Sequence, residues 1–364
     1  MDQFSEYELG TVCSRLSSGK GISAKDIFSE GKYPVYGGNG LRGYTDTCNF
    51  EGDCAIIGRQ GAFCGNVRYF SGKAYMTEHA VVCCANEYHN TRYLAYLLST
   101  MNLGRLSVQS AQPGLSVKTL SKQLVRLPSL EQQNKVAAVL STLDAKIAAN
   151  EKINDNLAET LQAIYQHRYS TTNQSANYET LASICSYSKA KVAVSELTLA
   201  SYYSTENMLP NKAGSVLAAS LPPTEQTTRC VTGDVLVSNI RPYFKKIVYC
   251  SNDCGCSPDV LCFTPKKPAL SAYLYCTLYA DHFFDFMMVG SKGAKMPRGD
   301  KQQIMTYAVH MPTEQELREF NGIAMPALAQ IESLRQENLR LSSLRDTLLP
   351  RLISGDIDVS SINL

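Results

Sequence analysis

Apolar residues recur at alternating steps of three and four in two long stretches of the chain. The first stretch comprises Leu140, Leu143, Ile147, Asn150, Asn154, Leu157, Leu161 and Ile164, and the second Ala324, Ala327, Ile331, Leu334, Asn338, Leu341, Arg345 and Leu348. This spacing predicts a coiled-coil seam of more than three heptads in each stretch. Asn154 and Asn338 take the same seam position, where a buried amide fixes the register at a cost in stability.

The first predicted helix, from Glu131 to Arg168, would be roughly 55 Å long at ~1.5 Å per residue. Two surface helices, each packed on its own domain, would be the alternative. The narrow seam and the length favour two helices paired as a rod that acts as a spacer.

Each stretch ends a segment that occurs twice in the chain. Residues 7–13 return as 178–185, residues 52–59 as 233–241, and residues 93–96 as 273–275. The offset between the copies stays between about 171 and 184 residues, so these repeated segments indicate a duplication. This period is too long for the repeats of a solenoid. The repeat predicts two domains, each with a helical tail.

We expect an α+β fold with two mixed α/β domains in a pseudo-two-fold repeat, separated by two long antiparallel coiled-coil helices. The expected boundaries are 1–128 and 178–312 for the two globular modules, 129–177 for the first helical spacer, and 313–364 for the second spacer and C-terminal tail. Within the modules, we expect packed helices over 92–101 and 272–288.

Composition predicts a cytoplasmic protein, because the N-terminus lacks the features of a signal peptide and no apolar run is long enough for a membrane span. The thirteen cysteines are scattered through a chain too large to need disulfides, so we interpret most of them as buried thiols. Cys250, Cys254, Cys256 and Cys262 form a cluster that could supply four thiolates to zinc, but they lack paired C-x2-C knuckles, so we expect no metal.

Positive charge is concentrated in the modules. Residues 10–128 contain 13 Lys or Arg against 7 Asp or Glu, and residues 186–312 contain 13 against 9. The net charge of the whole chain is only +2, so the excess negative charge lies elsewhere, mainly in the helical tails and at the N-terminus. Two positively charged modules suit a polyanion such as DNA.

Loops rich in Gly, Arg, Asn, Gln and Tyr supply groups that can reach bases and phosphates. In the first module the candidate DNA-binding residues are Tyr36, Asn39, Arg42, Arg59, Gln60, Gln112, Ser116 and Lys118. In the second they are Asn239, Arg241, Tyr243, Lys245, Lys246, Lys292, Lys295 and Arg298. Ser116 is a predicted helix N-cap whose loop could offer free amides to a phosphate, with 291–299 as its counterpart. The run 37–40 fits a plain turn between strands equally well.

The segment 233–244, the tail 348–359 and the duplicated coil together resemble the specificity (S) subunit of type I restriction-modification systems. The resemblance covers essentially the whole chain. It implies two target recognition domains that each read one half of an asymmetric bipartite site in double-stranded DNA. It also implies assembly with two methyltransferase (M) subunits and, for cleavage, two restriction (R) subunits. The two modules differ in their loops, so their half-sites should differ.

We predict that the chain is not an enzyme. It lacks an N-P-P-[YF] motif for a flipped adenine, and it lacks a P-loop. No catalytic residue and no cofactor is therefore expected on this chain; S-adenosylmethionine, ATP and Mg²⁺ would belong to partner subunits. The alternatives are a coiled-coil scaffold whose modules bind protein, and an orphan or alternate specificity subunit that serves a shared methyltransferase.

Overall fold

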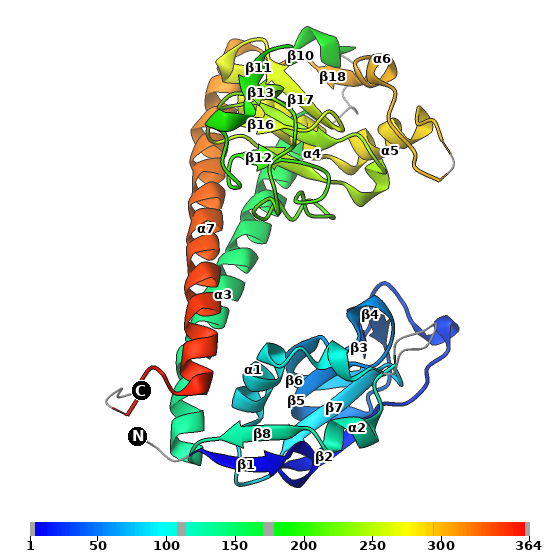
Figure 1. The fold of residues 1–364 in the computed structure, drawn as a ribbon. Helices are drawn as coiled ribbons and strands as arrows, with labels where there is room; N and C mark the ends of the chain where they lie inside the picture. Colours follow the sequence, from blue (N-terminus) through cyan, green and yellow to red (C-terminus); the bar gives the residue numbers. More distant parts are fainter. Residues whose placement is uncertain (1–3, 108–113, 170–177, 294, 361–364) are drawn as a thin grey trace. The chain divides into compact units, whose positions relative to one another are not determined.

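The computed structural model describes residues 4–107, 114–169, 178–293 and 295–360. These residues form two compact units, the first made of residues 1–147 and 341–364 and the second of residues 148–340. Each unit therefore contains one module of the repeat and one part of each long helix (Figure 1).

The two long helices predicted from the heptads are confirmed as α3 (Leu130–Tyr169) and α7 (Glu314–Ser354). Within the second unit they run antiparallel, because Asn150 contacts Asn338 while Arg168, further along α3, contacts Glu319, earlier in α7. In the first unit, Asp144 of α3 forms an ion pair of 2.9 Å with Arg345 of α7. All the predicted seam residues are buried or half-buried.

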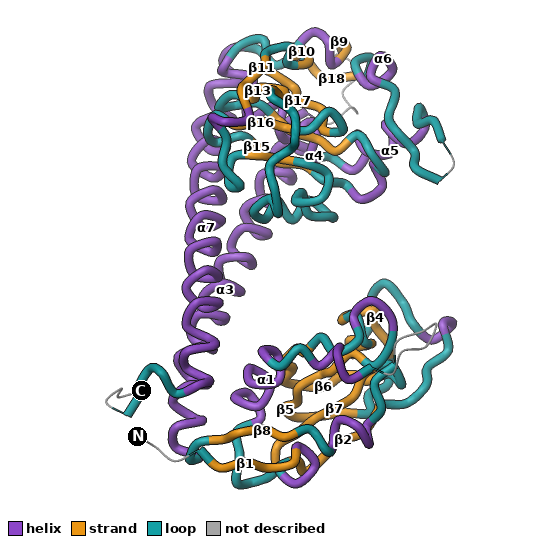
Figure 2. Tube along the Cα trace, in the orientation of Figure 1, coloured by secondary structure: helices purple, strands orange, loops and turns teal. Residues whose placement is uncertain are grey.

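The first unit is built around a six-stranded sheet in the order β2-β7-β5-β6-β3-β4, with β1 and β8 forming a separate pair (Figure 2). Helix α1 packs on β5 and β6 and buries Tyr93, Leu94 and Leu98. The strands are β1 (Ser5–Glu8), β2 (Cys13–Ser18), β3 (Tyr33–Gly37), β4 (Gly40–Thr45), β5 (Phe50–Gly58), β6 (Val67–Met76), β7 (Ala80–Ala85) and β8 (Leu124–Leu127), and the short helices are α1 (Thr91–Thr100) and α2 (Val117–Ser121).

The second unit repeats this plan with a smaller main sheet, β10-β17-β14-β15, and adds a second sheet, β11-β13-β16-β12. The pair β18-β9 corresponds to β8-β1 of the first unit. The strands are β9 (Tyr178–Thr180), β10 (Cys185–Tyr187), β11 (Lys191–Ala193), β12 (Tyr202–Tyr203), β13 (Gln226–Cys230), β14 (Val235–Ser238), β15 (Ile247–Tyr249), β16 (Cys254–Cys256), β17 (Val260–Pro265) and β18 (Ala308–His310).

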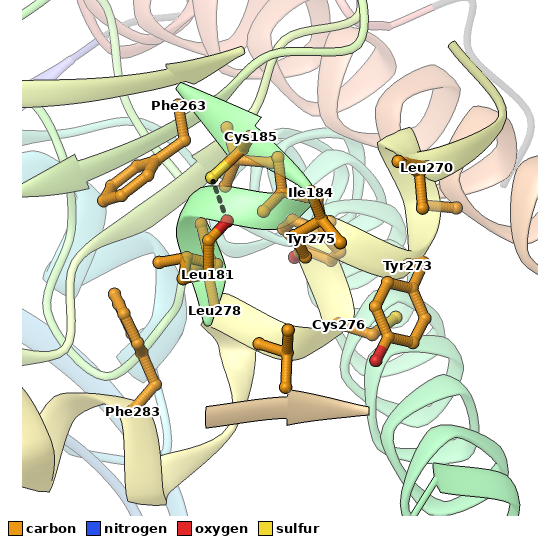
Figure 3. Packing of buried hydrophobic residues seen from close by; sticks show 14 of the residues in the cluster. Leu181, Ile184, Cys185, Phe263, Leu270, Tyr273, Tyr275, Cys276, Leu278 and Phe283 are labelled. Atoms are coloured by element: carbon orange, nitrogen blue, oxygen red, sulfur yellow. Dashed lines mark hydrogen bonds between the residues drawn. The ribbon is translucent and has the colours of Figure 1, made fainter. Parts of the chain in front are cut away.

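The core of the second unit joins this main sheet to its helices. Figure 3 shows Phe263 of β17 and Phe283 packed around Leu181, with Tyr273 and Cys276 on the neighbouring helix. Tyr165 and Tyr169 of α3 contact the Tyr273 ring at centroid distances of 5.5 and 5.0 Å, so the long helix is part of this core. The mixed α/β units and their repeat confirm the predicted fold class.

The helix expected over 272–288 is wrong in one respect: it is divided into α4 (Ser271–Tyr279) and α5 (Asp281–Val289), with Ala280 extended between them. Helix α4 is buried around nearly its whole circumference, whereas α5 buries only the side that carries Phe283, Phe284 and Met287. The break lets α5 turn its polar side to solvent. Lys301–Ile304 forms the short helix α6.

Candidate nucleic-acid interface

In the first unit, four segments meet where the central strand β5 ends. The Arg59 backbone N–H donates to the His79 carbonyl at 3.0 Å, and the Arg59 carbonyl accepts from the N–H of Leu115 at 2.9 Å. Gly38, in the turn of the β3–β4 hairpin, lies so close that an added Cβ would be 2.9 Å from the His79 carbonyl oxygen. The candidates on the hairpin and on β5 are therefore brought to one end of the sheet.

The side chains at this end are mostly free to meet a ligand. Asn39, Arg42 and Gln60 are exposed, Tyr36 is half-buried, and the half-buried Arg59 donates only long hydrogen bonds of 3.4 Å to the Ser18 hydroxyl and the Glu78 carbonyl. The run 37–40 is a hairpin turn, in which Gly40 has a φ of +104°. A turn of this kind can carry a contacting side chain at its tip.

The sequence analysis missed one cation of the first unit. Arg68, an exposed residue of β6, lies beside the hairpin, with its guanidinium 3.1 Å from the position of a Cβ on Gly40. Since β6 is far from the loops in sequence, only strand pairing reveals this proximity. Gln112, another candidate, lies outside the described residues.

The second unit has the corresponding cluster at the end of β14. The Asn239 N–H donates to the Asp259 carbonyl at 2.8 Å, and the Arg241 N–H donates to the Pro297 carbonyl at 2.8 Å. Pro297 and Arg298 therefore lie against the strand end, and the bridge of Lys292 with Arg298 brings both exposed side chains to the neighbourhood of Asn239 and Arg241.

Most of the lysines and arginines of this cluster have an acidic or carbonyl partner within the unit. Lys245 pairs with Asp281 at 2.8 Å, Lys292 with Asp300 at 2.8 Å and Arg298 with Asp259 at 3.2 Å. The Lys246 ammonium donates to the Thr205 carbonyl at 2.5 Å. Exposed ion pairs contribute about 0–1 kcal/mol, so Lys292 and Arg298 can exchange their carboxylates for a phosphate at little cost.

In both loops the N-cap side chain already accepts from part of the free helix N-terminal amides, and phosphate binding by the remaining amides stays a prediction. Ser116 is the N-cap of α2, and its hydroxyl accepts from the Thr119 N–H at 3.0 Å. At α6 the cap is Asp300, which accepts from Gln302 and Gln303. The Lys292 ammonium holds the pKa of Asp300 at about 2, so this carboxylate is charged and competes with a phosphate for Lys292. The side chains of Lys118 and Lys295 are exposed and are further candidates for phosphate contact at these loops.

Strand pairing also corrects the match between Arg59 and Arg241. Gly58 pairs with Ala80, and Ser238 pairs with Val260. The residue after each strand end donates its N–H to the carbonyl of the residue just before that partner: Arg59 to His79, and Asn239 to Asp259. Arg59 is therefore equivalent to Asn239, and Arg241 lies two residues further on. The second copy of this repeated segment, 233–241, is one residue longer than the first, 52–59, which hides this register.

The thiols of the second unit form a buried cluster that also takes in Cys230, which the sequence analysis did not include. The Cys254 and Cys250 sulfurs are 3.5 Å apart, and the Cys262 thiol donates to the Asp234 carboxylate at 3.2 Å. Within the described part of the chain, no group of three or more His, Cys, Asp or Glu is arranged to hold a metal ion. None of the helices in the described ranges is long and apolar enough to cross a membrane.

Comparison with known proteins shows which family the N-terminal part of the chain resembles. Residues 1–159 match the family model described as Type I restriction modification DNA specificity domain. The resemblance predicted from the sequence is thereby confirmed.

Relatives of known class agree. The type I restriction enzyme EcoprrI specificity subunit of Escherichia coli is 40% identical over 134 residues, which are 36% of this chain and 33% of that protein. The putative type I specificity subunit S.MpnORF507P of Mycoplasma pneumoniae is 28% identical over 148 residues, which are 39% of this chain and 40% of that protein. The chain thus matches well under two thirds of the length of either relative.

One solved structure resembles nearly the whole chain in its fold. The crystal structure of a type-I restriction-modification system S subunit from M. genitalium matches with a TM-score of 0.63 and covers 96% of both chains. The sequence identity is 17%, so this likeness concerns the fold.

Proposed function

We propose that the chain is the DNA-recognition subunit of a type I restriction-modification complex. Each unit binds one half of an asymmetric, interrupted target in double-stranded DNA. The observation that carries the proposal is the repeated cluster at the ends of β5 and β14, where polar and cationic side chains from loops distant in sequence meet in both units. The DNA specificity domain matched by residues 1–159 supports the same assignment.

Within each cluster we assign two tasks. The equivalent residues Arg59 and Asn239, at the strand ends, read base edges, because a guanidinium can bind guanine bidentately and an amide can do the same for adenine. Lys118, Lys292 and Lys295 contact phosphates, which fix the position of the unit on DNA without selecting a sequence. Methyl transfer and cleavage belong to two M and two R subunits, which would bind S-adenosylmethionine, ATP and Mg²⁺.

The test uses the full chain with its cognate M subunits. The chain alone should neither methylate nor cleave DNA, and the complex should methylate adenine at one asymmetric, interrupted site. The affinity for a duplex that carries this site should fall steeply as salt rises, because neutralised phosphates release counterions. A chain that transfers the methyl group by itself, or whose modules bind only protein at every salt concentration, would contradict the proposal.

Substitutions then separate the two tasks. Arg59→Ala should cost about 1–3 kcal/mol for one half-site and Asn239→Ala a similar amount for the other, whereas Lys295→Ala should weaken binding to all sequences and flatten the salt slope. Lys73→Ala is the matched control, since Lys73 is paired with Glu51 at the opposite end of β5. Identical sequence profiles for Arg59→Ala and Lys295→Ala would refute the division.

A further inference from the structure

A five-residue turn follows the central strand in both units. After the equivalent residues Arg59 and Asn239, the next residue of each unit forms an isolated bridge, Gln60 with Gly114 and Ile240 with Arg298. The turns that follow are therefore equivalent as well: residues 61–65 in the first unit and 241–245 in the second. Each contains one short 3-10 segment, Gly61–Phe63 or Pro242–Phe244.

The two turns share part of their backbone conformation and differ at the fourth residue, where Cys64 has a ψ of 124° and Phe244 belongs to the 3-10 segment. The first and fifth residues have positive φ in both, +75° and +85° at Gly61 and Gly65, and +49° and +50° at Arg241 and Lys245. The N–H of the fourth residue donates to the carbonyl of the first at 3.0 Å in each turn. Two sequences that share little thus place their first three residues in a similar way after the equivalent strand end.

The third residue of each turn is an exposed aromatic. Phe63 is 42% exposed and its equivalent, Tyr243, is 47% exposed. The neighbouring Phe244 is also exposed, and its ring centroid is 4.7 Å from that of Tyr243. A large ring exposed to solvent at the equivalent position of both units points to a contact with a partner.

Both turns are fixed by contacts with a second loop. In the first unit, Gly65 lies so close to Gly104 that an added Cβ would be 2.1 Å from the Gly104 nitrogen. In the second unit, the N–H groups of Asn211 and Lys212 donate to the carbonyls of Phe244 and Lys245 at 2.8 and 2.9 Å. A ring on such a preorganised turn loses little conformational freedom when it binds.

Polar groups beside the second turn lack partners. The Asn239 side chain is 8% exposed, and its Oδ1 has no hydrogen-bond partner among the described residues. The Nε of Arg241 is likewise buried and unpartnered within the described ranges. Unpaired buried donors and acceptors cost about 1–3 kcal/mol each, so their retention next to an exposed ring indicates a ligand with both polar edges and apolar faces.

We propose that Phe63 and Tyr243 are base-contacting aromatic tips, each packing its ring against a base step of the half-site that its unit reads. This inference rests on the proposed function. Duplex DNA is the occupant that fits: it offers hydrogen-bonding edges for Asn239 and Arg241, π-faces for the rings, and phosphates for the net positive charge of both modules. A protein surface would have no general need for this combination.

The experiment measures binding by the full chain with its cognate M subunits to a duplex that carries the methylated target of that complex. Phe63→Ala and Tyr243→Ala should each weaken binding about 5- to 150-fold, the range known for base–aromatic stacking. Tyr88→Ala is the matched control, because Tyr88 is 68% exposed in the first unit but lies outside the turn. A fluorescent base analogue is placed at successive steps of each half-site. With the wild-type complex, its fluorescence should report unstacking at one step of each half-site. Phe63→Ala should abolish this signal in one half-site only, and Tyr243→Ala in the other.

The outcomes separate the two proposals. If the wild-type complex shows no salt-dependent binding to any duplex, the proposed function fails and the aromatic tips fail with it. If the wild type binds its target and both alanine variants bind and unstack equally well, only the aromatic tips are refuted. If the variants instead lose M-subunit association in size-exclusion chromatography, the rings contact protein, and this inference is overturned while DNA recognition stands.

Discussion

Arg241 offers a direct measurement of the backbone strain in the second turn. Its φ and ψ are +49° and +65°, a left-handed conformation in which the Cβ of an L-residue crowds the following carbonyl at a cost of roughly 1–2 kcal/mol. The equivalent residue of the first unit is Gly61, which adopts its φ of +75° without that cost. The second unit therefore accepts strain in order to place an arginine.

Two substitutions at this position isolate the strain from the side chain. Arg241→Ala removes the guanidinium but keeps the Cβ, whereas Arg241→Gly removes both. Glycine has the greater entropy in the unfolded chain, which offsets about 0.5–1 kcal/mol of the relief. We expect Arg241→Gly to be more stable than Arg241→Ala by about 0.5–1 kcal/mol, or a few degrees in Tm for a unit of this size.

Chemical denaturation followed by circular dichroism suits this comparison, because the chain has no tryptophan. Lys267 provides the control, since it is exposed and has an ordinary extended φ of −134°. There the order should reverse, with the glycine variant about 0.5–1 kcal/mol less stable than the alanine variant. Both Arg241 variants should lose DNA affinity equally. An Arg241→Gly protein no more stable than Arg241→Ala would show that the turn is not strained.

Two further predictions concern buried polar groups. Burial raises the pKa of Asp234 above its ordinary 3.8, so the folded state holds a proton that the unfolded chain has already released. The contribution of Asp234 to stability is therefore fully present below the ordinary pKa of 3.8 and is lost as the pH rises through the raised pKa of the folded state. Urea denaturation from about pH 4 upward should show wild type losing stability relative to Asp234→Asn, and a difference independent of pH would contradict this assignment. On α3, the fully buried Asn150 donates to Glu337 and Asn338 at 2.8 Å, so Asn150→Ala should destabilise the chain by about 1–3 kcal/mol. The exposed neighbour Glu151→Ala serves as control, and equal effects of the two substitutions on the denaturation midpoint would show that the buried amide contributes nothing.

The sequence by itself determined the long helices and the repeat. Heptad spacing is a local property, because residues three and four apart share one face of a helix whatever the rest of the chain does. This is why the ends of α3, Leu130 and Tyr169, lie within one residue of the predicted limits. The loops that we propose to face DNA were also visible in the sequence as clusters of Gly, Arg, Asn and Gln.

Only the tertiary structure decided which residues of those loops are equivalent in the two units and which already have a partner within the protein. The bridges of Gln60 to Gly114 and Ile240 to Arg298 set the register of the two turns, and they join segments tens of residues apart. The same holds for the carboxylate of Asp259 beside Arg298. Such pairings depend on how strands align in a sheet, and a shift of one residue moves every side chain to the other face. Phe63 was therefore invisible as a candidate until its equivalence with Tyr243 was fixed by the backbone.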